Sequence, residues 1–175
     1  MQSELVSVII TCFNQGIFIE EALNSALNQT YKNIEVIIVD DCSTELKTVE
    51  LLEQIEARDK AKVIRKGLNT GVTKTRNLGF KESKGKFIVF LDGDDILDAE
   101  YIEKTLERFS VDRIGEVGFV TSNVKYFGTE NGEITYQNNG LAGFLVQSSA
   151  HTSSLVRREV VEQVNGFREN VAGYD

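Results

Sequence analysis

Short apolar runs alternate along the chain with longer segments in which apolar residues recur at helical spacing. The short runs are rich in β-branched residues, as is typical of strands that are buried on both faces of a sheet. They cover residues 5–10, 34–41, 62–66, 86–91 and 117–124. In one of the longer segments, Ile19, Leu23 and Leu27 fall on a single helical face. Strands that alternate with helices predict the α/β class, with a mostly parallel central sheet flanked by helices.

The last third of the chain departs from this alternation. Before it, the expected helices cover residues 19–27, 46–55, 76–83 and 99–109. From about residue 125 to 148, Gly, Asn and Thr become frequent, and the sequence predicts a hairpin with a turn near Asn131 and Gly132. Residues 155–167 predict a helix, with Gly166 where a C-terminal cap belongs. We therefore expect an irregular C-terminal third.

Composition narrows the possible partners. The chain has 175 residues, enough for a single domain, and a net charge of −8 at pH 7. Binding to a nucleic-acid backbone needs a basic surface, so we expect no nucleic-acid partner. Cys12 and Cys42 form neither a CxxC motif nor a disulfide framework, which favours a reducing compartment. The apolar run after Met1 is too short for a signal peptide or a membrane span, so we expect a cytoplasmic protein with no membrane span in this chain.

Polar residues gather directly after several predicted strands. In an open parallel sheet, ligands bind beyond the carboxyl ends of the strands, so these residues would meet at one edge. Arg76, on the helix that follows Asn69 and Gly71, can reach the same edge. The residues at the strand ends are Thr11, Cys12, Phe13 and Asn14 after the first strand, Asp40 and Asp41 after the second, and Asp92, Asp94 and Asp95 after the strand at 86–91. This edge is the candidate site.

The acidic cluster DGDD, residues 92–95, indicates a cation site. An Asp-x-Asp motif at a strand end suits Mg²⁺ or Mn²⁺, which binds carboxylate oxygens and shares its other positions with substrate phosphates. Such a cation would let an acidic protein hold and neutralise a diphosphate. The alternative is that the acids only cap the next helix, for which a single Asp would suffice. An EF-hand is excluded, because Ile96 and Leu97 stand where that loop needs an oxygen ligand and a glycine.

Several segments together resemble family 2 glycosyltransferases. They are VSVIITCFNQG (6–16), IEVIIVDDCST (34–44), NTGVTKTRNLG (69–79), GKFIVFLDGDD (85–95) and HTSSLVRREVVEQVNGFRE (151–169). They occur in the family's order and at its usual spacing, and the resemblance covers essentially the whole chain. It implies a GT-A fold, in which a Rossmann-like nucleotide-binding half continues into an acceptor-binding half. It also implies inverting transfer of a sugar from a nucleotide sugar.

The resemblance also implies a role for each matching position. Asp41 would accept a hydrogen bond from the uracil ring, and Arg76 would approach the base or the phosphates. Asp94 would bind Mg²⁺ or Mn²⁺ directly, with Asp92 near the ribose and the metal. Asp40 and Asp95 would be supporting residues, because adjacent strand positions point to opposite faces. The residues expected to line the nucleotide pocket after the first strand are Thr11, Cys12, Phe13 and Asn14.

The family resemblance ends at the position where the general base of the reaction is expected. An inverting transferase needs a base that deprotonates the acceptor hydroxyl. The family takes it from an acidic pair just beyond the Gly-Phe turn, and here that place is GYD, the last residues of the chain. Either Asp175 is the base or the base lies beyond it, and we expect a chain that is cut short at this motif. In the second case the chain would bind a nucleotide sugar without turning it over.

The expected organisation is a single domain, residues 1–175. Its nucleotide-sugar-binding half would be residues 1–124, and residues 125–175 would begin an incomplete acceptor-binding half. By family frequency the donor would be a UDP-sugar. The acceptor would be a glycan or a lipid-linked molecule, in the assembly of a surface polysaccharide or another glycan. A lipid-linked acceptor leaves open a peripheral position at the inner face of the membrane.

A second class of protein shares part of this pattern. Receiver domains of response regulators also place Asp side chains around one Mg²⁺ at strand ends. Lys125 would have to supply their lysine, and the DGDD motif and the later Gly-Phe segment would have no explanation.

Overall fold

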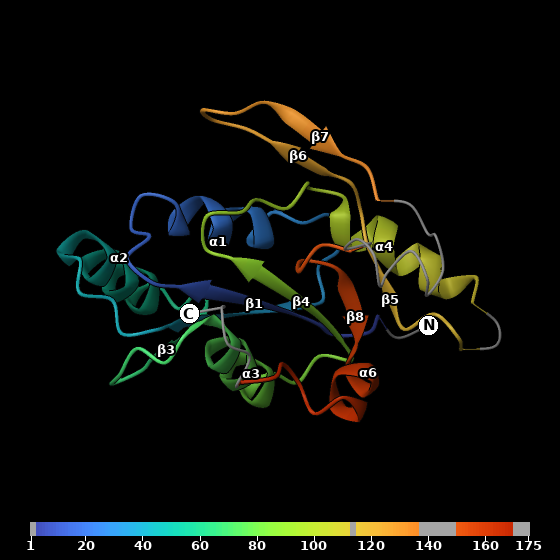
Figure 1. Ribbon diagram of the computed structural model, residues 1–175, viewed down its shortest axis with the longest axis horizontal. Helices are drawn as coiled ribbons and strands as arrows, with labels where there is room; N and C mark the ends of the chain where they lie inside the picture. The colour runs from blue at the N-terminus through green and yellow to red at the C-terminus, as the bar shows by residue number, and fades with distance from the viewer. Residues whose placement is uncertain (1–2, 113–114, 137–149, 170–175) are drawn as a thin grey trace.

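The computed structural model describes residues 3–112, 115–136 and 150–169, and its central feature is a sheet of six strands in the order β3-β2-β1-β4-β8-β5 (Figure 1). Strands β1 to β4 are parallel, and β8 lies antiparallel between β4 and β5. The expected α/β class with a mostly parallel sheet is therefore confirmed. The strands are β1 (Val6–Cys12), β2 (Ile34–Asp40), β3 (Lys62–Arg65), β4 (Phe87–Asp92), β5 (Phe119–Val120) and β8 (Leu155–Arg157).

Helices cover both faces of the sheet (Figure 1). Their bounds are α1 (Ile19–Leu27), α2 (Leu46–Ala57), α3 (Val72–Glu82), α4 (Tyr101–Ser110) and α6 (Arg158–Gln163). Buried residues of α1, α2 and α4 pack on one face, and residues of α3 and α6 pack on the other. Among the described residues, no helix combines the length and the apolar character needed to cross a membrane.

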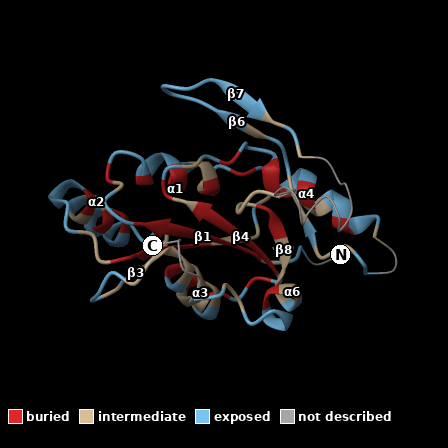
Figure 2. Cartoon of the chain, viewed as in Figure 1, coloured by how far each residue is buried: buried red, intermediate tan, exposed pale blue. Residues whose placement is uncertain are grey.

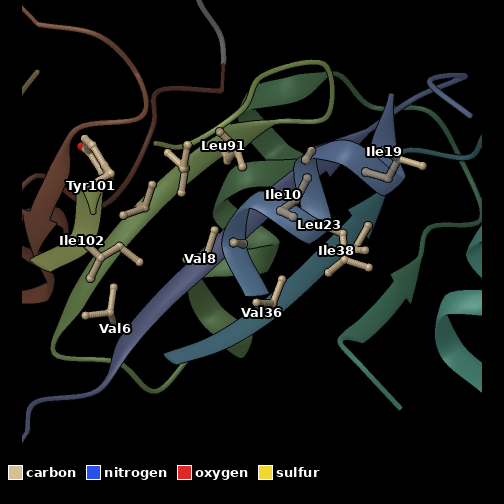
Figure 3. Close-up of a cluster of buried hydrophobic side chains, with 14 of the residues drawn as sticks. Val6, Val8, Ile10, Ile19, Leu23, Val36, Ile38, Leu91, Tyr101 and Ile102 are labelled. Carbon is tan, nitrogen blue, oxygen red and sulfur yellow. The ribbon is translucent and has the colours of Figure 1, made fainter. Parts of the chain in front are cut away.

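The central strands are buried on both faces, which explains their continuous apolar sequences. All seven residues of β1 are buried, and only the last residue of β4 is partly exposed. Figure 2 shows the buried positions concentrated in these strands and on the inner sides of the helices. Figure 3 shows Val8 and Ile10 of β1 in the cluster that also contains Ile19 and Leu23 of α1. Residues on alternate positions of the same strand, such as Ile9, pack against α3 instead.

The register of the strands decides which polar residues share a face. Thr11 is paired with Asp92 across β1 and β4, and Cys12 is paired with Asp40 across β1 and β2. Because side chains alternate along a strand, Thr11 and Asp92 continue the face that carries Ile9 and Phe90, which is the face covered by α3. Thr11 and Asp92 are therefore presented to α3 at the carboxyl edge of the sheet.

Three local predictions were wrong. The run at 117–124 is not one strand, because only Phe119–Val120 pair with β8, and Val124–Tyr126 form β6 in a separate hairpin with β7 (Gly132–Ile134). The turn of that hairpin lies at residues 128–129 rather than 131–132, and it uses Gly128 at φ +90°.

The predicted helix at 155–167 is also shorter than expected. Leu155–Arg157 pair with β4 as strand β8, and the helix begins only at Arg158. Local apolar spacing did not show that β4 offers these residues an open sheet edge. Gly166 does lie at the turn that ends the helix, with φ +74° and its N–H bonded to the carbonyl of Val161 at 2.9 Å.

Close packing of α3 on the sheet depends on a glycine. A Cβ atom at Gly79 would lie 2.3 Å from Cγ2 of Ile9 and 3.1 Å from Cγ2 of Val39. We predict that Gly79→Ala lowers the free energy of unfolding by about 1–3 kcal/mol, because the helix must move off the sheet. Urea denaturation measures this difference.

Gly67→Ala is the matched control. Nothing lies within 4 Å of a Cβ placed at Gly67, so we expect a change within about 0.5 kcal/mol. Equal stability of the two variants would contradict the close contact between α3 and β1.

Candidate active site

A cavity of about 590 Å³ opens at the carboxyl edge of the sheet, between the β1–α1 loop, the start of α3 and the loop after β4. It brings together most residues that the sequence singled out. The lining consists of Thr11, Cys12, Phe13, Gln15, Asp41, Asn69, Gly71, Val72, Thr75, Arg76, Asp92 and Asp94. Segments separated by up to about eighty residues in the chain thus meet in one place, as expected for an open parallel sheet.

Asp92 is the centre of the polar contacts in this cavity. Its Oδ1 accepts a hydrogen bond from Oγ1 of Thr11 at 3.0 Å and an ion-paired hydrogen bond from Arg76 at 2.7 Å. The side chain of Arg76 is 12% exposed and that of Asp92 is 32% exposed, so the pair lies at the border between the core and solvent. Nε of Arg76 is buried and has no hydrogen-bond partner among the described residues.

The DGDD motif forms a tight turn at the end of β4. The N–H of Asp95 bonds to the carbonyl of Asp92 at 3.0 Å. A Cβ at Gly93 would lie 2.7 Å from the carbonyl oxygen of Thr11 and 2.5 Å from Oε1 of Gln15, so only glycine fits there. The turn leaves Asp94 exposed at the cavity.

Asp95 faces a second cleft, of about 530 Å³, on the side of the turn toward α4 and the β6–β7 hairpin. Burial raises the pKa of this carboxyl group, although the nearby His151 opposes the shift. The neighbouring carboxylates of Asp92 and Asp94 add to the increase. The two acids at the end of the motif therefore line different cavities.

The residues present can contribute to a metal site but do not form a complete one. Within the described ranges, no group of three or more His, Cys, Asp or Glu side chains is arranged to hold a metal ion. Asp92 and Asp94 both line the cavity and offer the hard oxygen ligands that Mg²⁺ and Mn²⁺ prefer. If Asp92 and Asp94 were its protein ligands, the other coordination positions of the cation would belong to water or to oxygens of a bound diphosphate. The donor set fits a cation that arrives with its ligand.

Asp41 makes contacts that the sequence did not predict. Its carboxylate accepts hydrogen bonds from Lys66 Nζ at 2.5 Å, from the N–H of Thr70 at 3.0 Å and from the N–H of Gly71 at 2.8 Å. Asp41 is buried and Lys66 is nearly so, with side-chain exposures of 7% and 12%. Lys66 Nζ also bonds to the hydroxyls of Thr70 and Thr75. Asp41 therefore lines the cavity and fixes the loop that leads into α3.

Asn14 and Asp40 lie beside the cavity rather than on its lining. Oδ1 of Asn14 accepts hydrogen bonds from the N–H groups of Thr44 and Glu45, at 2.8 and 2.9 Å. Asp40 accepts from the N–H and the hydroxyl of Ser43. Both side chains thus hold the loop before α2. The nucleotide-binding role expected for Asn14 stays a prediction.

Cys12 lines the cavity as a packing residue. Burial and the Asp40 carboxylate raise the pKa of Cys12 to about 12, so the thiol has no thiolate form to act as a nucleophile near neutral pH. Asp175, the predicted base, lies outside the described residues.

Other lining residues were missed by sequence reasoning. Gln15, Val72 and Thr75 lie in loops or early helix turns, where their residue types are common for purely local reasons. Lys66 follows a short strand and resembles a surface cation in the sequence. The available signal was that Lys66 ends the third predicted strand, just as Asp40 and Asp41 end the second, so that the three residues would meet at the same edge of the sheet.

Comparison with known proteins identifies the family. The sequence model of glycosyl transferase family 2 matches residues 7–164, and the chain therefore belongs to this family. It is 36% identical over 107 residues to an uncharacterized glycosyltransferase of Haemophilus influenzae, which covers 61% of this chain and 42% of that protein. It is 38% identical over 104 residues to TuaG of Bacillus subtilis, a glycosyltransferase named for teichuronic acid biosynthesis, which covers 59% of this chain and 41% of that protein. The chain thus spans less than half the length of either relative.

Solved structures share the fold. TarS 1–349 of S. aureus in complex with UDP-GlcNAc superimposes with a TM-score of 0.75 at 24% identity, covering 93% of this chain and 48% of that one. The mannosyltransferase PcManGT of Pyrobaculum calidifontis, in complex with GDP-Man and Mn²⁺, gives a TM-score of 0.70 at 21% identity. The match covers 97% of this chain and 49% of that one. The expected GT-A fold is confirmed. Family membership also excludes the receiver-domain alternative. Lys125, which that alternative required, lies on the exposed hairpin strand β6.

The buried ion pair gives a stability prediction. We predict that Asp41→Asn lowers the free energy of unfolding by about 3 kcal/mol, because it removes the anionic partner of a largely buried lysine. Urea denaturation at neutral pH measures the change.

Glu53→Gln serves as the control for this substitution. Glu53 pairs with Arg65 at 3.4 Å on the surface, with 62% of its side chain exposed, so we expect a change within about 0.5 kcal/mol. An equally small effect of Asp41→Asn would contradict a structural role for the Asp41–Lys66 pair.

Proposed function

We propose that this chain carries the donor-binding part of an inverting glycosyltransferase that moves a sugar from a UDP-sugar to an acceptor hydroxyl, with the help of Mg²⁺ or Mn²⁺. The proposal depends on one observation. Asp92, Asp94, Arg76 and Asp41, which the sequence singled out separately, line a single cavity in a chain that belongs to glycosyl transferase family 2. The lining residues all lie before residue 124, which agrees with a nucleotide-sugar-binding half at residues 1–124.

Relatives with the same fold support a nucleotide-sugar ligand. TarS was solved with UDP-GlcNAc, and PcManGT with GDP-Man and Mn²⁺. We assign uracil as the base because it is the commonest in the family. The name of TuaG, with its reference to teichuronic acid, supports an acceptor in the assembly of a surface polysaccharide. We place this sugar transfer at the cytoplasmic face of the membrane, where a lipid-linked acceptor would be within reach.

Different residues of the cavity would bind different parts of a charged donor. A divalent cation bound between the carboxylates and the donor would neutralise the departing diphosphate. Asp92 and Asp94 provide carboxylate oxygens for it, and Thr11 fixes the orientation of Asp92 through its hydroxyl. Arg76 is the one cationic side chain among the described residues of the lining, so it would meet the phosphates. In this arrangement the anomeric carbon of the donor would lie near the DGDD turn.

The acceptor would approach from the opposite side of that turn. The cleft that Asp95 lines also contains Asn123, Lys125, Phe127 and His151. The amide of Asn123 and the exposed ring of Phe127 together suit the polar edges and apolar faces of a sugar. A base then removes the proton of the attacking hydroxyl, and we assign this to Asp175 or to an acid that follows it. If the base follows it, the chain binds its donor without turnover.

Nucleotide titration tests the donor site. We predict that UDP binds in the presence of Mn²⁺ and that EDTA weakens this binding by about tenfold or more, since two carboxylates alone repel a diphosphate. Isothermal titration calorimetry of the 175-residue chain measures both affinities. ADP and GDP are the controls for base recognition. Absence of binding by every nucleotide would contradict the donor site, and tighter binding of GDP would contradict the assignment of uracil.

A single carboxylate should carry the metal dependence. We predict that Asp94→Ala abolishes the difference between UDP titrations with Mn²⁺ and with EDTA. The fold should remain intact, because Asp94 is exposed and a surface substitution changes stability by only about 0.5 kcal/mol. The titrations are repeated on Asp98→Asn, an exposed acid four residues later that lines only the other cleft. Wild-type metal dependence in Asp94→Ala, or its loss in Asp98→Asn, would be incompatible with this assignment.

A further inference from the structure

The turn at Gly166 and Phe167 is fixed to helix α3 by one side chain. Nδ2 of Asn77 donates to the carbonyl of Phe167 at 2.9 Å, and Oδ1 of Asn77 accepts from the N–H of Phe167 at 2.8 Å. Gly166 has no room for a side chain, because a Cβ there would lie 2.5 Å from Oδ1 of Asn77. The N–H and the carbonyl group of Phe167 are thus both bound by the side-chain amide of Asn77, which fixes the position of the Phe167 ring.

That ring lies against the cation of the candidate donor site. Cζ of Arg76 is 5.4 Å from the centroid of the Phe167 ring, within the range of a cation–π contact. The ring also makes a T-shaped contact with Phe90, with the centroids 4.9 Å apart and the planes at 88°. Arg76 is held between this ring and the carboxylate of Asp92.

The hydrogen bonds of Arg76 do not fix its position by themselves. Its Nε is buried and unpaired within the described part of the chain, and its ion pair uses a single terminal nitrogen, Nη2. A long arginine side chain with one such contact would otherwise sample several rotamers, and ordering it would cost free energy when a ligand binds. The ring of Phe167 supplies the second contact that limits this motion.

We infer that Phe167 is a positioning residue of the donor site, which holds the Arg76 guanidinium where the diphosphate binds, and that Asn77 holds Phe167 in turn. Neither Phe167 nor Asn77 lines the cavity, so each acts through Arg76. This inference rests on the proposed function, since it gives the turn beyond α6 a role in binding the nucleotide diphosphate. It couples a segment near the end of the chain to a pocket built by its first half.

The same helix offers a matched control. Phe80 of α3 carries Arg158 over its ring at 4.7 Å, and neither residue lines the donor cavity. Phe80 and Phe167 are both half-buried and pack against the same apolar cluster. Phe80→Leu therefore removes the same kind of contact at a comparable cost in packing, but away from the ligand.

The experiment compares UDP affinity in the presence of Mn²⁺ for the wild type and four variants by calorimetry, with thermal melting to show that each is folded at the titration temperature. We expect Phe167→Leu to weaken UDP binding about fivefold, as loss of a partly buried cation–π contact would. Phe167→Tyr keeps the aromatic face and should bind within about twofold of the wild type. Asn77→Ala frees the turn and should resemble Phe167→Leu, whereas Phe80→Leu should bind as the wild type does.

Each outcome separates the inference from the function on which it rests. If wild-type protein binds no UDP, the proposed function fails and the inference fails with it. If the wild type binds and Phe167→Leu binds equally well, only the inference is overturned. Equal weakening by Phe167→Leu and Phe80→Leu, or no rescue by Phe167→Tyr, would assign the effect to packing alone and would also overturn it.

Discussion

The buried ion pair between Asp41 and Lys66 is the interaction on which the geometry of the cavity depends. Removing two charges from water is costly, and this cost is offset here because the carboxylate also accepts two backbone N–H groups from the loop that precedes α3. That loop sets where α3 begins, and the helix carries Arg76 to the carboxylate of Asp92. A pair formed by the residues that follow β2 and β3 thereby helps to set the position of the Arg76 guanidinium, which meets Asp92 at the end of β4.

Sequence reasoning predicted the parts of the site that follow from strand ends. A buried apolar run that stops at an acid places that acid at the edge of the sheet, and this was enough to bring Asp41, Asp92 and Asp94 into one region. The register that orients them toward α3 follows from the two-residue period of a strand. The sequence pattern that carried the family resemblance also indicated the GT-A fold, which the structural comparisons confirmed.

What the sequence could not show depended on contacts between distant segments. Leu155–Arg157 have helical spacing, yet they form a strand because β4 has an open edge beside them. Lys66 became a buried partner only because Asp41 lies on the adjacent strand. The sequence placed both Asn14 and Thr11 directly after the first predicted strand, but the amide of Asn14 turns toward the loop before α2. In each case the local sequence was compatible with several outcomes, and tertiary pairing selected one.

The two edges of the main sheet differ from its centre in a way that bears on association between molecules. The outer strand β5 has only two residues, and β3 has four, among them Lys62 and Arg65. Lys62 is paired with Glu82, so charged side chains border that edge. A short edge bordered by charges offers few free backbone groups to a strand from another molecule. Both edges of the sheet therefore disfavour strand pairing between copies of the chain, which leaves the carboxyl edge with its acidic cavity as the part of the sheet open to a ligand.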